Sequence, residues 1–176
     1  MSAFQADSSD SVVVMGVDTS LRSTGVGLIR VIGRRMDPVA YEVIKNSVRH
    51  SHSVCLLHLF ERLTDVIAEF KPATVAIEGV FFCKNIRTTL VLGEARGVVI
   101  AACSSAGLTI HEYAPRRVKQ SVVGFGAAEK NQVRRMVMSL LQLTAEPHED
   151  ASDALAIALC HANAFSRVGG QLGDSI

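Results

Sequence analysis

Short apolar, β-branched segments bounded by turn residues recur along the chain and predict five β-strands. These strands are Val12–Asp18, Thr24–Ile32, Val39–Val48, Thr74–Glu78 and Leu108–Tyr113. Apolar residues recur at spacings of three and four from Ser51 to Phe70, which is the period of an amphipathic helix. Further helices are predicted over Arg87–Ala106, Pro115–Val122, Ala127–Leu143 and Glu149–Phe165. The order of elements predicts an α/β fold, with a mixed five-stranded sheet flanked by helices.

The 176 residues are expected to form one domain over 12–165, with a flexible N-terminal arm at 1–11 and a flexible tail at 166–176. Hydrophobic residues make up 48% of the chain and charged residues 20%, which is typical of a soluble globular protein. No apolar run approaches the roughly 20 residues of a membrane span. The first residues lack the basic start and apolar core of a signal peptide, so a cytoplasmic location is expected.

The four cysteines form no Cys-x-x-Cys pair and stand among apolar or small neighbours. They are Cys55, Cys83, Cys103 and Cys160. Buried, reduced thiols are expected, and a zinc site is not. The formal net charge of +1 is uninformative alone, because a nucleic-acid partner requires a local basic patch rather than a basic whole.

Four acidic residues stand at the ends of predicted elements. Asp18 ends the first strand and Glu78 the fourth, while Asp150 and Asp153 open the last helix. Residues three apart share a helix face, whereas Glu149 is rotated away from Asp150 by about 100°. Strand ends and a helix start can converge on one point in an α/β fold. The pattern therefore predicts a cluster of carboxylates at one edge of the sheet.

Each of these acids has an ordinary explanation when it is taken alone. First-turn acids interact favourably with the helix dipole, Asp18 suits a turn, and Glu78 suits the end of a strand. Carboxylates that converge near a core repel one another and need a cation, usually a hard divalent metal. Two Mg²⁺ ions about 4 Å apart would suit phosphoryl transfer. His148 lies close in sequence, but an exposed loop histidine is the favoured interpretation.

Extended motifs around these acids resemble those of RuvC, the bacterial Holliday-junction resolvase family. Val14–Asp18 with Arg22–Gly27 resembles its first strands, and Ala76–Asn85 its second motif. The helix residues Leu92–Gly97 follow, and Asp150–Ala158 resembles the last motif. Two stretches are similar to its basic DNA-binding region, namely Tyr113–Gln120 and Gly126–Val133. The resemblance covers roughly Val12 to Asn163 with the motifs in the same order.

This resemblance implies a ribonuclease-H-like fold, a homodimer, and dependence on Mg²⁺ or Mn²⁺. It implies that the catalytic, metal-binding acids are Asp18, Glu78, Asp150 and Asp153. It also implies four-way junction DNA as substrate, cut by paired symmetric nicks in recombination and repair, and the branch-migration proteins RuvA and RuvB as partners. One departure follows Asp18, where Thr19–Leu21 replaces the family's usual Pro-Gly-Ser, so the local turn geometry is an open question.

Basic and aromatic residues near these motifs suit contact with a branched DNA substrate. The resemblance places a base-contacting wedge on Phe81 and DNA-contacting lysines on Lys119 and Lys130. The full set of expected DNA-binding residues is Phe81, Lys84, Arg87, Arg116, Lys119, Lys130 and Arg134. An ordinary solvated helix face is the alternative for the cations, and core or interface packing is the alternative for Phe81.

One further helix feature concerns assembly. Gly93, Gly97 and Ala101 share a stripe on the helix Arg87–Ala106. The stripe suits close contact with a second copy, and packing on the chain's own sheet is the alternative.

Three other functions fit parts of the sequence. Another nuclease of the ribonuclease-H fold, acting on hybrids or flaps, would use the same acids. A sugar-kinase-like ATPase would need a second nucleotide-binding half, which 176 residues cannot supply. A non-catalytic junction-binding module would not need the four acids. A junction-cutting endonuclease that uses metal-activated water is therefore the favoured hypothesis.

Overall fold

The fold is a six-stranded mixed sheet with helices on both faces. The computed structural model describes residues 11–79, 85–166 and 173–176. The strands are β1 (Ser11–Asp18), β2 (Ser23–Ile32), β3 (Arg35–Lys45), β4 (Thr74–Glu78), β5 (Thr109–Tyr113) and β6 (Asp174–Ser175). The helices are α1 (His52–Phe70), α2 (Ile86–Ser105), α3 (Pro115–Val123), α4 (Lys130–Leu140) and α5 (Glu149–Ser166). Among the described residues, no helix has the length and apolar content needed to span a bilayer.

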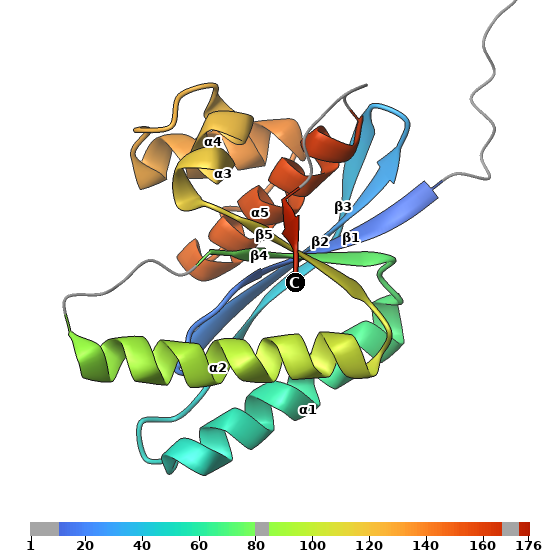
Figure 1. Cartoon of the computed structure of the whole chain (residues 1–176). Coiled ribbons are helices and arrows are strands. Elements are labelled where there is room, and N and C mark those ends of the chain that lie inside the picture. Colours follow the sequence, from blue (N-terminus) through green and yellow to red (C-terminus); the bar gives the residue numbers. More distant parts are fainter. Residues whose placement is uncertain (1–10, 80–84, 167–172) are drawn as a thin grey trace, which may run out of the picture.

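The strand order is β3-β2-β1-β4-β5-β6. The first three strands form an antiparallel meander, β4 and β5 run parallel to β1, and β6 is antiparallel to β5. Helices α1 and α2 cover one face, and α5 covers the other with α3 and α4 beside it (Figure 1). The expected α/β class with a mixed sheet is confirmed.

The buried core lies in two layers, one on each face of the sheet. Side chains along β1 alternate between them: Val14 packs with α5, while Met15 and Val17 pack with α1 and α2. This alternation is the two-residue period of a strand whose two faces are both covered. Because both layers are apolar, the polar ends of the strands are the places where chemistry can be located.

Several boundaries differ from those expected. The third strand begins at Arg35 rather than Val39 and continues through Pro38, which is tolerated because β3 is an edge strand. Helix α4 begins at Lys130 rather than Ala127, because Glu129 and Gln132 form a capping box that fixes its start. Lysine at position 71 adopts a left-handed conformation and ends α1, directly after Phe70, as expected.

A sixth strand is the main departure from the expected sheet. Asp174 and Ser175 pair with Glu112 and His111 of β5, inside the segment expected to be a flexible tail. Two polar residues carry no apolar alternation, so their pairing could not be read from the sequence. Of the expected N-terminal arm, only Ser11 is described, and it begins β1.

The cysteines that the structure describes are free and buried, as expected. They are Cys55, Cys103 and Cys160, while Cys83 lies outside the described residues.

Candidate active site

Two of the four acids lie side by side because β1 and β4 are parallel neighbours. Val17 pairs with Ile77, so the next residues, Asp18 and Glu78, follow at the same edge of the sheet. Val17 and Ile77 are fully buried, which anchors both strands up to their last residues. The sequence pattern of an apolar run ending in an acid thus corresponds to adjacent carboxylates at the carboxyl edge of two parallel strands.

Glycines in β1 and β2 bring the other two acids to the same edge. Gly25 is the cross-strand partner of Asp18, and a Cβ added to Gly25 would lie 1.9 Å from the carbonyl oxygen of Asp150. A Cβ added to Gly16 would lie 2.1 Å from the carbonyl oxygen of Ala154. Helix α5 therefore rests directly on the strand backbone, and its first turn presents Asp150 and Asp153 beside Asp18.

The four carboxylates lie within electrostatic reach of one another. Burial raises the pKa of Asp18 to about 7, with further contributions from the charges of Asp153, Glu78 and Asp150. The pKa values of Glu78 and Asp153 are also raised, first by burial; nearby Asp153 adds to the shift of Glu78. Three neighbouring acids with raised pKa values are typical of a functional site.

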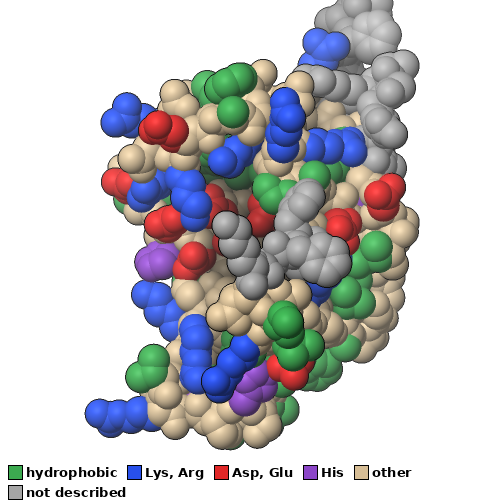
Figure 2. Space-filling model, turned by 60° about the vertical axis from the view of Figure 1, so that its left-hand side comes forward, with side chains coloured by type: hydrophobic (Ala, Val, Ile, Leu, Met, Phe, Trp, Pro, Cys, Tyr) green, Lys and Arg blue, Asp and Glu red, His purple; other side chains and the backbone are tan. Residues whose placement is uncertain are grey.

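Lysine side chains supply positive charge at the rim of this cluster. The Lys130 ammonium donates to Glu149 Oε1 at 2.6 Å and lies 3.4 Å from Asp153 Oδ2. Its pKa is raised, chiefly by the hydrogen bond to Glu149. Lys119 is close enough to lower the pKa of Glu78 against the effect of burial. Figure 2 shows acidic side chains gathered in the middle of this face, with basic side chains above and below them.

A pocket of about 190 Å³ opens between Asp18 and Glu78. Thr19 also lines it, and the buried Thr19 Oγ1 has no hydrogen-bond partner among the described residues. The Asp150 carboxylate is held differently, since it accepts a hydrogen bond from the Ser23 hydroxyl. His148 Nδ1 lies 3.4 Å from Asp150 Oδ2 on the exposed side. An unsatisfied buried hydroxyl beside two carboxylates suits a site that receives a polar ligand.

The chemistry of this donor set fits a hard divalent cation, which prefers carboxylate oxygens. Within the described part of the chain, however, no three His, Cys, Asp or Glu side chains form a group that could hold one ion as they stand. Lys130 meanwhile contacts one of the acids. Binding of an ion would therefore require the carboxylates to turn toward it.

Arg96 and Glu112 are site residues to which the sequence analysis assigned no role. The Arg96 guanidinium donates to the backbone carbonyl of Glu78 at 2.9 Å and forms an ion pair with Glu112. The Arg96 side chain is only 14% exposed and lines the same pocket. A Cβ added to Gly79 would lie 2.7 Å from Glu112 Oε1, so glycine at 79 leaves room for this pair. The motif Gly93–Gly97 contains Arg96, but no sequence signal linked it to Glu112.

The residues expected to bind DNA differ in their surroundings. Lys119 and Lys130 lie beside the acids, and Arg116 is exposed on α3. Arg134 is held by Asn131 and by an ion pair with Glu146, and so is less available to a phosphate. Arg87 lies apart from these, in the first turn of α2. Phe81 and Lys84 lie outside the described residues.

Comparisons with known proteins identify the family of this chain. A curated relative from Heliobacterium modesticaldum, a crossover junction endodeoxyribonuclease RuvC, is 42% identical over 88% of this chain and 96% of its own length. The corresponding protein of Saccharophagus degradans is 47% identical over 86% of this chain and 87% of its own. A solved structure of Thermus thermophilus RuvC in complex with Holliday junction substrate superposes with a TM-score of 0.86 at 32% identity, and covers 94% of this chain and 99% of that one.

The likeness to that solved structure confirms the expected ribonuclease-H-like fold, with one strand more than the sequence predicted. The sequence profile described as "Crossover junction endodeoxyribonuclease RuvC" matches residues 14–161. The matched segment includes all four acids and the glycines of β1 and β2 on which α5 rests. The chain belongs to the RuvC family of crossover junction endodeoxyribonucleases.

Proposed function

We propose that this chain resolves four-way DNA junctions by paired, symmetric nicks, with Asp18, Glu78, Asp150 and Asp153 as its catalytic acids. The observation that carries the proposal is the meeting of these acids at one edge of the sheet, with the pKa of Asp18 raised to about 7 by burial and by its acidic neighbours. Acids that repel one another this strongly are suited to compensation by cations. Family membership supplies the substrate class.

The reaction is hydrolysis of a phosphodiester by in-line attack of water. Mg²⁺ or Mn²⁺, two ions per site in this proposal, would lower the pKa of the attacking water and offset charge on the leaving oxygen. Asp18 and Glu78 flank the pocket of the site, so their carboxylates are placed to hold an ion and orient water there. Lys119 and Lys130 reduce the repulsion that a DNA phosphate meets on approach to four acids.

DNA binding is assigned to Lys119 and Lys130 beside the acids, to Arg116 on α3 and to Arg87 in the first turn of α2. Such cations position a phosphate backbone and make affinity dependent on salt. Arg134 contributes less in this proposal because Glu146 already pairs with it. Base contact by Phe81 and phosphate contact by Lys84 remain predictions from the family resemblance.

We propose a homodimer with α2 as its contact face. Ile86 and Leu90 are 77% and 63% exposed, and a Cβ added to Gly93 or Gly97 would meet nothing within 4 Å. The glycine stripe therefore faces away from the chain's own sheet, which removes the alternative that it packs there. An exposed apolar and small-residue face suits a second copy of the same helix, and two-fold symmetry supplies two equivalent sites for paired cuts.

The cellular setting of this proposal follows the family resemblance. It comprises a cytoplasmic location and association with the branch-migration proteins RuvA and RuvB. Co-sedimentation of the chain with junction DNA bound by RuvA, against junction DNA alone, tests the partnership. If RuvA does not increase the amount of chain that sediments with the junction, this partnership is ruled out.

Synthetic substrates test the main proposal. A four-way junction, an RNA–DNA hybrid and a flap of shared sequence are incubated with the wild-type chain and Mg²⁺. Symmetric nicks in the junction, with little cutting of the others, are expected. Preferred cutting of the hybrid or flap would favour another nuclease specificity. Junction binding without any metal-dependent cutting would favour a non-catalytic binding module.

A further inference from the structure

A second pocket lies beside the catalytic one. It has a volume of about 470 Å³, within the ~300–1,000 Å³ range of ligand sites, and it lies between the β1–β2 turn, the start of α1 and the start of α2. Leu92 lines both pockets. Thr19 lines the catalytic pocket while the next residue, Ser20, lines this one. The two pockets are therefore neighbours that share the wall formed by Leu92 and the β1–β2 turn.

The wall formed by the β1–β2 turn is held in place by the surrounding structure. Asn46, only 7% exposed, donates from its side chain to the carbonyl oxygens of Leu21 and Cys55 at 2.8 and 3.0 Å. The Thr24 hydroxyl closes the turn by donating to the Ser20 carbonyl. The Arg22 guanidinium binds the loop before α1, including the His50 carbonyl. The pocket wall is thus bonded to β2, to the loop between β3 and α1, and through Asn46 to Cys55 of α1.

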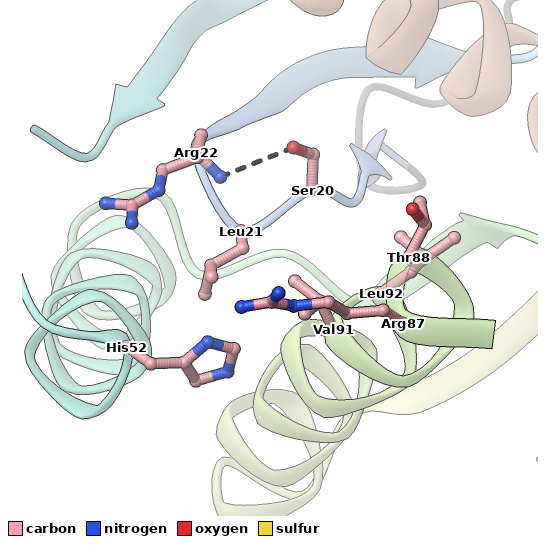
Figure 3. A pocket seen from close by; sticks show the side chains of 8 residues that line it. All are labelled: Ser20, Leu21, Arg22, His52, Arg87, Thr88, Val91 and Leu92. Carbon is pink, nitrogen blue, oxygen red and sulfur yellow. Dashed lines mark hydrogen bonds between the residues drawn. The ribbon is translucent and has the colours of Figure 1, made fainter. Parts of the chain in front are cut away.

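The lining combines an apolar floor with two arginines, of which Arg22 is bound to the loop before α1. Leu21, Val91 and Leu92 supply the apolar part (Figure 3). Figure 3 shows Arg87 extending from the first turn of α2 across the pocket toward the side of His52. His52 pairs with Glu94, whereas no hydrogen bond or ion pair of the Arg87 guanidinium is present among the described residues. The site therefore offers a charge for an anion and a dry surface next to it.

We propose that this pocket receives one unpaired nucleotide of the DNA strand whose phosphate lies at the four acids. Its phosphate would contact Arg87, and its base would rest on Leu21, Val91 and Leu92. A base in a duplex cannot enter a concave apolar pocket, whereas an unpaired base can, and burial of its apolar faces there is favourable. Leu21 belongs to the Thr19–Leu21 turn, in which this chain departs from the family's usual Pro-Gly-Ser. The inference rests on the proposed DNA-cutting function.

Junction binding in EDTA tests the phosphate contact. Arg87→Ala should reduce the slope of log affinity against log salt concentration by about 0.7–0.9, the value for one phosphate contact. Thr88→Glu, which places a carboxylate at the pocket, should weaken binding about 5-fold or more, because the carboxylate repels the phosphate. Arg34→Ala removes an equal charge from the β2–β3 turn at the opposite end of the β1–β2 ladder and should change neither quantity.

Base insertion is tested by 2-aminopurine placed in turn at each position flanking the cut phosphate. At one position, binding of the wild type or of Arg34→Ala should change the 2-aminopurine emission of the junction. Binding of Arg87→Ala or Thr88→Glu should leave the emission at that position unchanged. Arg87 and Thr88 are exposed, so thermal melts should match the wild type. An unchanged salt slope would overturn the proposal. The proposal would also be overturned if Arg87→Ala reduced the salt slope but no 2-aminopurine position distinguished the variants from the wild type. Arg87 would then contact a paired strand. Cutting of the junction by the wild type in Mg²⁺ tests the nuclease function separately.

Discussion

At the scale of single residues, the negative charge of Asp18 lowers the stability of the folded chain. Its carboxylate is largely withdrawn from water and is surrounded by Asp153, Glu78 and Asp150, which together raise its pKa to about 7. Between the unfolded value near 3.8 and this folded value, the folded chain binds more protons than the unfolded chain. The metal-free protein therefore loses stability from this group as pH rises from about 4 to 7. An acid whose ionisation destabilises the fold in this way is suited to binding a cation.

Asp18→Asn should abolish junction cutting while junction binding survives. In EDTA at pH 7.5 the variant should also unfold with a free energy roughly 1–3 kcal/mol higher than the wild type, after allowance for solvent screening. This advantage should shrink as pH falls toward 4, because Asp18 is then protonated in the folded wild type. Urea unfolding at several pH values, with cutting assays at pH 7.5, provides the measurement.

The stability of the variant is compared with that of the wild type because another group has the opposite pH dependence. The pKa of buried His161 is lowered to about 4, chiefly by burial and then by His111, so His161 reduces stability as pH falls below about 6.5. This contribution is common to both proteins and cancels in their difference. Asp65→Asn, in an exposed pair with Arg62, serves as the control and should change the free energy of unfolding little at any pH. Equal stability of Asp18→Asn and wild type at pH 7.5 would contradict the inference that ionised Asp18 destabilises the folded chain.

Arg96 contacts the backbone of Glu78, so we expect it to influence the reaction by positioning Glu78 rather than by contacting DNA. Arg96→Lys and Glu112→Gln should each reduce cutting about 10- to 100-fold, the usual effect of losing a residue that orients a metal ligand. Added Mg²⁺ should partly restore the rate, since a misplaced Glu78 weakens ion binding. Cutting rates over a Mg²⁺ titration give the measurement, and Arg62→Lys, in the exposed pair with Glu42, is the control. A loss that no Mg²⁺ concentration relieves would argue against a positioning role.

At the scale of elements, the site depends on how closely α5 approaches the sheet. Three glycines of β1 and β2 leave no side chain between the strands and the helix: Gly16, Gly25 and Gly27. A Cβ at Gly27 would lie 2.7 Å from the Leu155 amide nitrogen, in the next turn of the helix from Ala151. The separation of Asp18 from the first turn of α5 is therefore set by the backbone itself.

Gly25→Ala tests this dependence directly. The added methyl group would collide with the backbone at Asp150, so α5 must shift away from Asp18. A loss of about 1–3 kcal/mol in the free energy of unfolding is expected from overpacking, together with a large fall in cutting. Chemical unfolding and a cutting assay measure the two effects. Retention of full cutting by a destabilised variant would show that the catalytic geometry tolerates a displaced helix.

The sequence predicted those elements whose pattern is local. Apolar runs ending in acids located Asp18 and Glu78, and the spacing of Asp150 and Asp153 placed them on one helix face and set Glu149 aside. In the structure Glu149 instead binds Lys130. The Arg96–Glu112 pair joins residues 16 apart in different elements, so no periodicity indicated it. The β6 strand was missed for a similar reason, because two polar residues gain their order from an edge far away in the sequence.

At the scale of the whole molecule, paired nicks require two sites in one particle. The exposed face of α2 is where the proposed two-fold axis would lie, since Leu90 and Ile86 are its large apolar residues. A single chain carries only one set of the four acids. Coordinated cutting on both sides of a junction therefore depends on association.

Leu90→Glu should convert the protein to a monomer, because a carboxylate would be buried against its own symmetry mate. Sedimentation velocity at micromolar concentration measures the mass, and a cutting assay on closed junctions should show single nicks in place of paired ones. Leu140→Glu, which changes another exposed leucine at the end of α4, is the control and should leave the mass unchanged. A dimeric Leu90→Glu variant would place the two-fold axis elsewhere.

The short strand β6 has a practical consequence for handling the protein. It covers the free edge of β5, and Glu112, which it pairs with, also holds Arg96 next to Glu78. A C-terminal affinity tag, or trimming before Gly173, would disturb this edge and leave β5 open to pairing with other molecules. Purification handles are therefore better placed at the N-terminus, where β1 enters the sheet from the end opposite Asp18.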